Sequence, residues 1–169
     1  MEEQSEKIAN IKKWMDLYGD CVMRMCLLYL KDYQDAEDAV QETFFKAYIK
    51  YDSFLGKSSE KTWIVRISIN VCKNMLRKKK AAEVSMEEVL NQISVDGNFE
   101  RPMIEQFVLE QIMRLPVRYK DVILLHYYQE MKVEEIAEVL HIPKSTVKTR
   151  LKRGRERLEP FLEEELLYE

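Results

Sequence analysis

Apolar residues recur along the chain at the three- and four-residue spacing that is typical of amphipathic helices. In the first half, this spacing predicts helices over residues 8–30, 35–48 and 63–80. Asp35 is the expected N-cap of the second helix, and a polar loop over residues 53–62 precedes the third. Each predicted helix keeps one apolar face, which it can bury against its neighbours.

The second half repeats the pattern over four shorter segments, with predicted helices at 104–115, 119–128, 133–140 and 144–158. A polar, acidic stretch over residues 81–101 separates the two halves and is the expected linker. Gly and Pro, at 4 residues each, are too scarce for a many-turned sandwich or barrel. The prediction is an all-α fold with two small helical domains joined by an acidic flexible linker. The domains cover residues 1–80 and 102–169, and the second is a helix-turn-helix domain of four helices.

Length and composition indicate whether the chain can form two cores and in which cellular compartment the protein is expected. The chain has 169 residues, of which 46% are hydrophobic, and this suffices for two small cores. The three cysteines form no C-x-x-C pair, so neither a disulfide framework nor a zinc site is expected from their spacing. No apolar run reaches the roughly 20 residues that a membrane span needs. We therefore expect a cytoplasmic protein without a metal, a cofactor or an inserted membrane segment.

The net charge is only -3, but the charges are gathered in blocks. Residues 32–45 hold acids and no base, whereas residues 61–80 hold seven bases and no acid. Residues 144–157 hold another seven bases against Glu156 alone. Two basic blocks in a chain of nearly neutral charge favour a polyanion that is contacted at two places. Two solvated helix faces are the alternative interpretation.

The second basic block lies on the last helix of a predicted helix-turn-helix. Ala137 allows a close approach of the two helices, and Pro143 suits the first turn of the second one. In such motifs the second helix enters the major groove of DNA. The residues near its start that are expected to reach base edges are Lys144, Ser145, Thr146, Lys148 and Thr149. Those expected to contact phosphates are Arg150, Lys152, Arg153 and Arg155.

An acidic face marks the second predicted helix of the first half. Asp35, Asp38 and Glu42 share one side of that helix at spacings of three and four residues, with Gln41 beside them. A docking face for another protein is the more specific interpretation, and a face that contacts only solvent is the alternative. A metal site is disfavoured because no His or Cys stands nearby.

The next predicted helix is basic on the side opposite its apolar stripe. That side carries Arg66, Asn70, Lys73, Asn74 and Arg77, a mixture of bases and amides that suits phosphates and base edges. Trp63, at the start of this helix, can stack on a base. Its apolar spacing with Ile64 and Ile67 equally fits a core residue.

Three segments in chain order resemble the extracytoplasmic-function group of bacterial sigma factors. Residues 35–48 resemble the polymerase-docking helix of that family, and residues 62–74 resemble its promoter-melting helix. Leu115-Pro116, residues 134–137 and residues 146–151 resemble the domain that reads the minus-thirty-five element. With the acidic linker, the resemblance covers nearly the whole chain.

The resemblance implies an alternative sigma factor that binds core RNA polymerase and directs transcription at stress-responsive promoters. By matching position, Asp35, Asp38, Gln41 and Glu42 would dock on the polymerase clamp. Asn70 would touch the melted minus-ten strand. The partners implied are core RNA polymerase, promoter DNA and an anti-sigma factor, membrane-anchored, that masks both DNA-binding domains until a stress signal arrives.

Two positions depart from the usual pattern. Glu60 stands where the family often has an aromatic residue, which places a carboxylate near the expected path of the DNA strand. His141 occupies the joint where helix-turn-helix motifs commonly have Gly, and His tolerates a positive φ better than most residues.

Two other classes of protein account for fewer of these features. A conventional repressor or activator would use the same helix-turn-helix, but it would leave the acidic helix and the first basic helix without a role. An enzyme is not expected, because His126 and His141 are the only histidines and no nucleophile–base pair is apparent.

Overall fold

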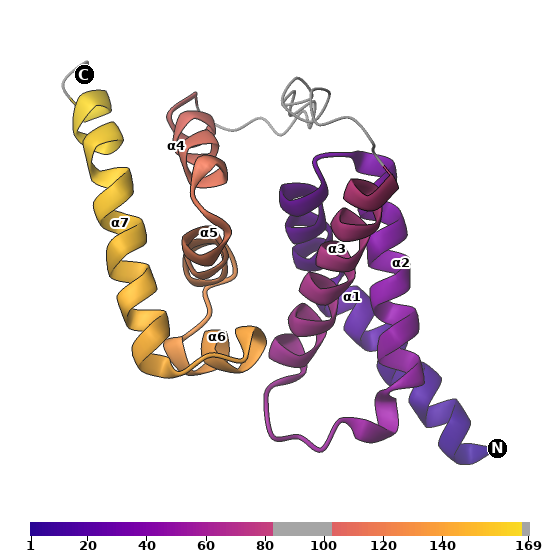
Figure 1. Cartoon of the computed structure of the whole chain (residues 1–169). Helices are drawn as coiled ribbons and strands as arrows, with labels where there is room; N and C mark the ends of the chain where they lie inside the picture. The colour runs from indigo at the N-terminus through magenta and orange to yellow at the C-terminus, as the bar shows by residue number, and fades with distance from the viewer. Residues whose placement is uncertain (83–102, 167–169) are drawn as a thin grey trace. The chain divides into compact units, whose positions relative to one another are not determined.

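In the computed structural model, the described residues are 1–82 and 103–166. The chain divides into two compact units, one that holds α1 to α3 and another that holds α4 to α7 (Figure 1). All regular structure among the described residues is helical, which confirms the all-α prediction. The linker predicted over residues 81–101 overlaps the last two residues of α3, and the rest of it lies outside the described residues.

The first unit is a bundle of α1 (Glu2–Leu30), α2 (Tyr33–Ile49) and α3 (Glu60–Ala82), in which each helix packs against the other two. A single 3₁₀ turn, η1 (Tyr51–Ser53), follows α2. At one end of the core, the rings of Trp14, Phe54 and Trp63 lie 5.1 to 5.8 Å apart between centroids. This cluster ties the loop after η1 to both α1 and α3.

Helix α1 begins at Glu2 and α5 at Val117, both earlier than predicted, and the starts of α2 and α3 differ from the prediction because of capping. Asp35 is not the N-cap of α2; Asp32 is, and its Oδ1 accepts a hydrogen bond of 2.8 Å from the Asp35 N–H. The helix therefore begins at Tyr33, two residues earlier. Likewise α3 begins at Glu60, because the Ser59 hydroxyl accepts a bond of 3.1 Å from the Thr62 N–H and so satisfies a free donor of the first turn.

The second unit contains α4 (Met103–Arg114), α5 (Val117–Ile123), α6 (Val133–Leu140) and α7 (Lys144–Leu166). The single helix predicted over residues 119–128 is wrong in part: α5 ends at Ile123 and continues as a π-helical segment, η2 (Leu124–Tyr128). The last helix runs to Leu166 and includes Pro160, beyond the predicted end at Leu158. Helix α7 packs against α4, α5 and α6, so it is the common support of this unit.

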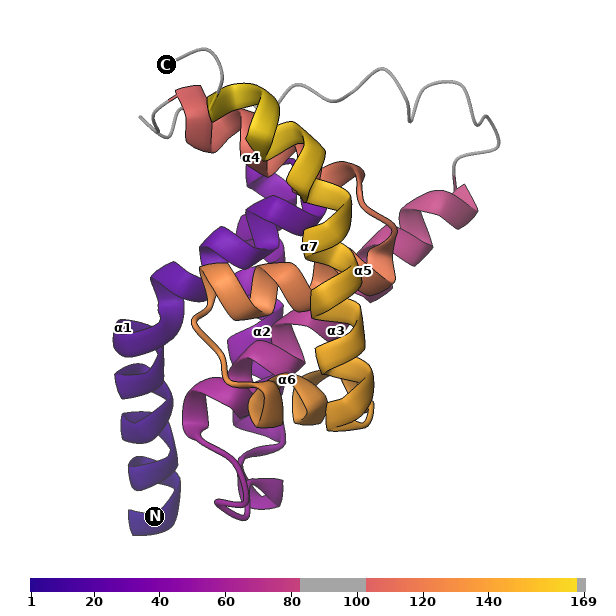
Figure 2. The same cartoon turned by 90° about the vertical axis from the view of Figure 1, so that its left-hand side faces the viewer.

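The joint between α6 and α7 lies at residues 141–143, as the sequence predicts. His141 adopts φ 53° and ψ 46°, the left-handed conformation, and so ends α6. The N–H groups of His141 and Ile142 both donate to the Ala137 carbonyl, which closes the last turn. Helices α6 and α7 consequently meet at a sharp corner (Figure 2), with Ile136, Val139, Val147 and Leu151 buried between the elements of the unit.

Candidate docking face and nucleic-acid interfaces

The acidic face of α2 separates into one restrained residue and three exposed ones. Asp35 is half-buried and forms an ion pair with Lys79 of α3, so its carboxylate is held within the unit. Asp38, Gln41 and Glu42 are exposed on neighbouring turns of α2. Glu42 is partly neutralised by Lys46, at 2.7 Å on the same helix. The exposed acidic surface is therefore narrower than the sequence predicts.

Beside these acids lies an apolar groove that the sequence analysis missed. It encloses about 300 Å³ between α1 and α2. Its lining residues are Ile8, Ile11, Lys12, Met15, Gln41, Phe44, Phe45 and Tyr48. Ile8 and Met15, predicted on the inner stripe of α1, are 42% and 47% exposed, and Phe45 is 63% exposed. The signal in the sequence was Phe45, an aromatic residue that stands off the apolar stripe of α2.

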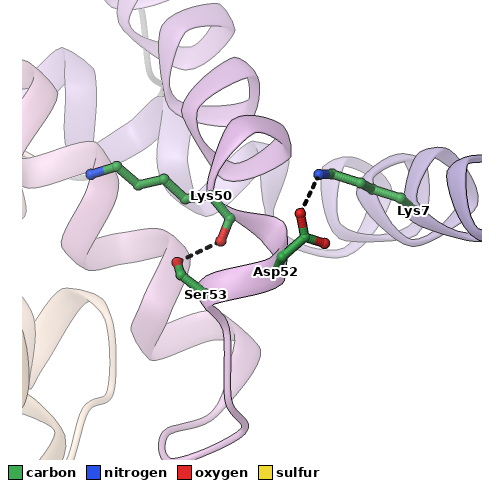
Figure 3. A network of polar contacts seen from close by, with 4 residues as sticks. All are labelled: Lys7, Lys50, Asp52 and Ser53. Carbon is green, nitrogen blue, oxygen red and sulfur yellow. Dashed lines mark hydrogen bonds and ion pairs between the residues drawn. The ribbon is translucent and has the colours of Figure 1, made fainter.

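Contacts of Lys7 hold the first turns of α1 in place beside the groove. Its ammonium lies 3.1 Å from Asp52 Oδ2 and 4.9 Å from the centre of the Tyr48 ring (Figure 3). Next to it, the Ser53 hydroxyl donates a bond of 2.6 Å to the Lys50 carbonyl, which holds η1 against the end of α2. These contacts join the first turns of α1 to the α2–η1 corner and keep the groove and the acidic face on one rigid body.

The basic side of α3 is partly exposed, whereas Trp63 at the start of the helix is buried. Asn70 and Arg77 are exposed, while Arg66, Lys73 and Asn74 are half-buried. The Arg77 guanidinium donates a bond of 2.8 Å to the Asn74 side-chain carbonyl, so these two side chains act as one surface. Trp63 is only 5% exposed and packs on Trp14 and Phe54. This favours the core alternative and removes Trp63 from the expected DNA contacts.

Glu60, the departure noted above, is engaged inside the first unit. The Tyr18 hydroxyl of α1 donates to Glu60 Oε2 at 3.3 Å. Burial raises the pKa of Tyr18, and the charge of Glu60 adds to that effect. The carboxylate therefore has a neutral hydrogen-bond donor beside it.

Two adjacent rows of side chains run along the start of α7. One row, at spacings of four, consists of Lys144, Lys148 and Lys152, with Arg155 next to it. Lys144 lies 3.7 Å from Glu134 and Lys152 lies 3.9 Å from Glu156, and all four side chains are more than half exposed. Such pairs are weak in water. The lysines therefore remain available to another partner.

The position of Glu134 at the start of α6 affects the pKa of its carboxyl group. Its pKa is lowered, first by a hydrogen bond from its own backbone N–H and then by Lys144 and Lys148, against an opposing effect of burial. It stays ionised beside the lysine row at neutral pH and limits the positive charge there.

The second row faces α5 and lines a hollow of about 330 Å³. The lining residues are Arg118, Tyr119, Ser145, Thr146, Thr149, Arg150 and Arg153. Five of these were predicted to contact DNA, and the hollow shows that they converge on one place. Arg118 and Tyr119, from the first turn of α5, were missed because they lie 26 or more residues away in sequence from the rest.

Comparisons with known proteins find matches to both units of the chain. Residues 14–82 match the family sigma-70 region 2, and residues 108–158 match the family sigma-70 region 4. The chain is 38% identical to the ECF RNA polymerase sigma factor SigW of Bacillus subtilis over 157 residues, which cover 85% of this chain and 84% of that protein. It is 33% identical to the RNA polymerase sigma factor SigV of the same organism over 131 residues, or 78% of each chain.

The fold is also similar to that of two solved structures. One is the sigma factor RpoE in complex with the anti-sigma factor NepR from Bartonella quintana, with a TM-score of 0.74 and 23% identity, covering 91% of this chain and 97% of that one. The other is CnrH in complex with the cytosolic domain of CnrY, with a TM-score of 0.71 and 20% identity, covering 96% and 93%. None of the helices described for this chain is both long and apolar enough to cross a membrane.

Proposed function

This chain belongs to the extracytoplasmic-function group of RNA polymerase sigma factors, and from that premise we propose which of its surfaces meets which partner. Members of this family are transcription initiation factors rather than catalysts. The observation that carries the assignment is the order of three exposed surfaces on rigid helices: acidic on α2, basic on α3 and basic on α7.

The proposed polymerase-docking face consists of Asp38, Gln41 and Glu42, with Phe45 and the groove beside them. Two acids next to an exposed aromatic ring suit a partner surface that is basic and partly apolar. Asp35 contributes less than the sequence predicted, because its ion pair with Lys79 must break before it meets a partner.

The proposed minus-ten contacts lie on α3. Asn70 presents an exposed amide, which can both donate to and accept from a base edge. Arg66, Lys73 and Arg77 supply positive charge along the same helix for the phosphate chain of the strand. Asn74 acts by fixing the Arg77 guanidinium.

The proposed minus-thirty-five contacts lie on α7 and follow its two rows. Lys144, Lys148 and Lys152 belong to the row that is farther from α5, so base-edge contacts are proposed for Lys144 and Lys148. Ser145, Thr146 and Thr149, which the sequence analysis assigned to base edges, gather at the hollow with Arg150 and Arg153. All five are now proposed to hold the DNA backbone. Lys152 and Arg155, farther along the helix, are proposed as outer phosphate contacts.

Each unit alone offers few phosphate contacts, so the isolated protein should bind duplex promoter weakly, near the roughly 10⁻⁴–10⁻⁶ M range of non-specific binding. Core polymerase would fix both units over one promoter and make the second contact intramolecular, a gain of roughly 10²–10⁴ in avidity. We also propose an anti-sigma partner, since two proteins of this fold are described in complex with one or with a cytosolic domain of another protein. Such a partner would cover the acidic face and the basic surfaces.

The test is promoter binding and run-off transcription with the full chain, with and without core polymerase. The double variant Asp38→Lys, Glu42→Lys should lose polymerase binding and keep its fold. The matched control is Glu6→Lys, Asp20→Lys, which makes the same charge change at two exposed positions of α1 on the side away from the groove. Tight, dimeric binding to closed duplex by the protein alone, with no transcription upon addition of polymerase, would support a repressor instead.

A further inference from the structure

The hollow between α5 and α7 has the composition of an anion site. Its seven lining residues include three arginines and four hydroxyl-bearing side chains, and none is a carboxylate. This differs from the lysine row next to it, which has Glu134 and Glu156 within 4 Å of its ammonium groups. The row of α7 that faces α5 therefore has no carboxylate among the residues that line its hollow, whereas the lysine row is partly neutralised by two glutamates.

Tyr119 lines this hollow and interacts with three guanidinium groups. It is 4% exposed. The guanidinium carbons of Arg118 and Arg157 lie 4.9 and 5.1 Å from the centre of its ring, within the range of cation–π attraction. Its hydroxyl oxygen accepts a hydrogen bond from Arg153. Burial alone would raise the pKa of Tyr119, but the Arg153 hydrogen bond and the charges of Arg118, Arg153 and Arg157 together lower it.

Three like charges around one ring repel one another unless something compensates. The electron-rich face of the ring and the phenol oxygen provide that compensation without introducing a negative group. The arginines are thus held together while the hollow stays free of carboxylates. Guanidinium groups held in place in this way lose little rotamer freedom when they bind an oxyanion.

We infer that this hollow seats one backbone phosphate of the DNA duplex, and that Tyr119 is a positioning residue that holds Arg153 toward that phosphate. The inference rests on the proposed function. It adds to that function the position of one bound phosphate, a contact from Arg118 of α5, and the role of Tyr119 in positioning Arg153. Because the contact is to the backbone, it carries no sequence information; it fixes how α7 lies in the groove so that the lysine row meets the bases.

A double-mutant cycle with holoenzyme tests this role. Tyr119→Phe keeps the ring and removes the hydroxyl oxygen that accepts from Arg153, and it should weaken promoter binding about fivefold, the factor for one lost hydrogen bond. Arg153→Ala should weaken binding further and lower the salt slope by about one. The double variant should bind no more weakly than Arg153→Ala alone, since Tyr119 acts through Arg153.

Two further variants complete the design. Arg118→Ala changes an exposed residue, so it should fold normally and show the same loss on every promoter variant. Tyr127→Phe is the matched comparison: its hydroxyl also accepts from an arginine, Arg155, at 3.2 Å, but Tyr127 is 51% exposed and outside the hollow. Since Arg155 is proposed only as an outer phosphate contact, Tyr127→Phe should weaken binding less than Tyr119→Phe does, and an equal loss would overturn the special role of Tyr119. Circular dichroism melting identifies the temperature at which all variants are folded.

Additive losses in the cycle would overturn the positioning role of Tyr119, as would unchanged binding by Tyr119→Phe. Losses at Arg118 or Arg153 that depend on the base pair, or no loss at Arg118, would overturn the phosphate seat. In each of these cases wild-type holoenzyme still transcribes from the promoter. Absence of promoter-specific transcription by the wild type would instead overturn the proposed function, and the phosphate seat with it.

Discussion

Replacing Gly154 with alanine tests how closely α5 and α7 are packed beneath the hollow. Gly154 is buried on α7, and a Cβ added there would stand 3.0 Å from Ile123 Cγ1 and 3.2 Å from Ile123 Cδ1. Carbon atoms normally approach to about 3.5–4.0 Å. Ile123 is only 1% exposed, so it has little room to withdraw.

Two opposing effects set the size of the change in stability. Alanine is favoured over glycine in a helix interior by roughly 0.8–1 kcal/mol. Overpacking of a filled core costs roughly 1–3 kcal/mol. The difference is a net destabilisation of about 1 kcal/mol, which would lower the melting temperature of a unit of this size by about 4–8 °C.

Gly19 provides a matched control, because a Cβ there meets nothing within 4 Å on α1. Gly19→Ala should therefore stabilise the first unit by roughly 0.8–1 kcal/mol. Hydrogen exchange of the backbone amides measures the opening free energy of each helix separately. If Gly154→Ala stabilises α5 and α7 as much as Gly19→Ala stabilises α1, the packing argument is refuted. With Ile123→Ala as the background, which removes both Cγ1 and Cδ1, the penalty of Gly154→Ala should disappear.

The remaining predictions concern three other places. Asp38→Lys with Glu42→Lys should shift the melting temperature little, because both residues are exposed, while polymerase affinity falls; equal affinity in the folded variant would contradict the docking role. His141→Val should destabilise the second unit by about 1–2 kcal/mol in urea unfolding, because a β-branched residue is strained at φ 53°. His141→Gly should not destabilise it, and equal effects of the two variants would refute the strain argument. A thiol reagent should label half-buried Cys21 in the folded protein and the two buried cysteines only after unfolding. Hydrogen bonding to Cys72 and burial raise the pKa of the Cys26 thiol, and equal labelling rates for all three cysteines would contradict the prediction.

Local features could be predicted from the sequence with good accuracy. The apolar period fixes which helices exist, and the joint of the helix-turn-helix follows from Leu140, His141 and Pro143 within four residues of one another. For His141 the sequence indicated only that a positive φ would be tolerated there, and the structure has that conformation. Helix starts were harder, since Asp32 and Asp35 both suit an N-cap and the period does not distinguish them.

Contacts between distant segments could not be predicted in this way. Arg118 and Tyr119 follow Pro116 with no local sign that they face α7, because periodicity describes one helix at a time. The groove was missed for the same reason: Ile8 and Met15 fit an inner stripe, and only the crossing of α1 and α2 leaves them half exposed. The ion pair of Asp35 with Lys79 joins residues 44 positions apart.

The aromatic cluster of the first unit has a spectroscopic consequence. Trp14 and Trp63 are the only 2 tryptophans of the chain, and their rings lie 5.8 Å apart in one buried core. Excitation at the red edge of the absorption band therefore reports the first unit alone, whereas the second unit contributes tyrosine emission only. Fluorescence followed in parallel with circular dichroism will show whether added DNA, which contains no tryptophan, stabilises one unit or both, with no label attached.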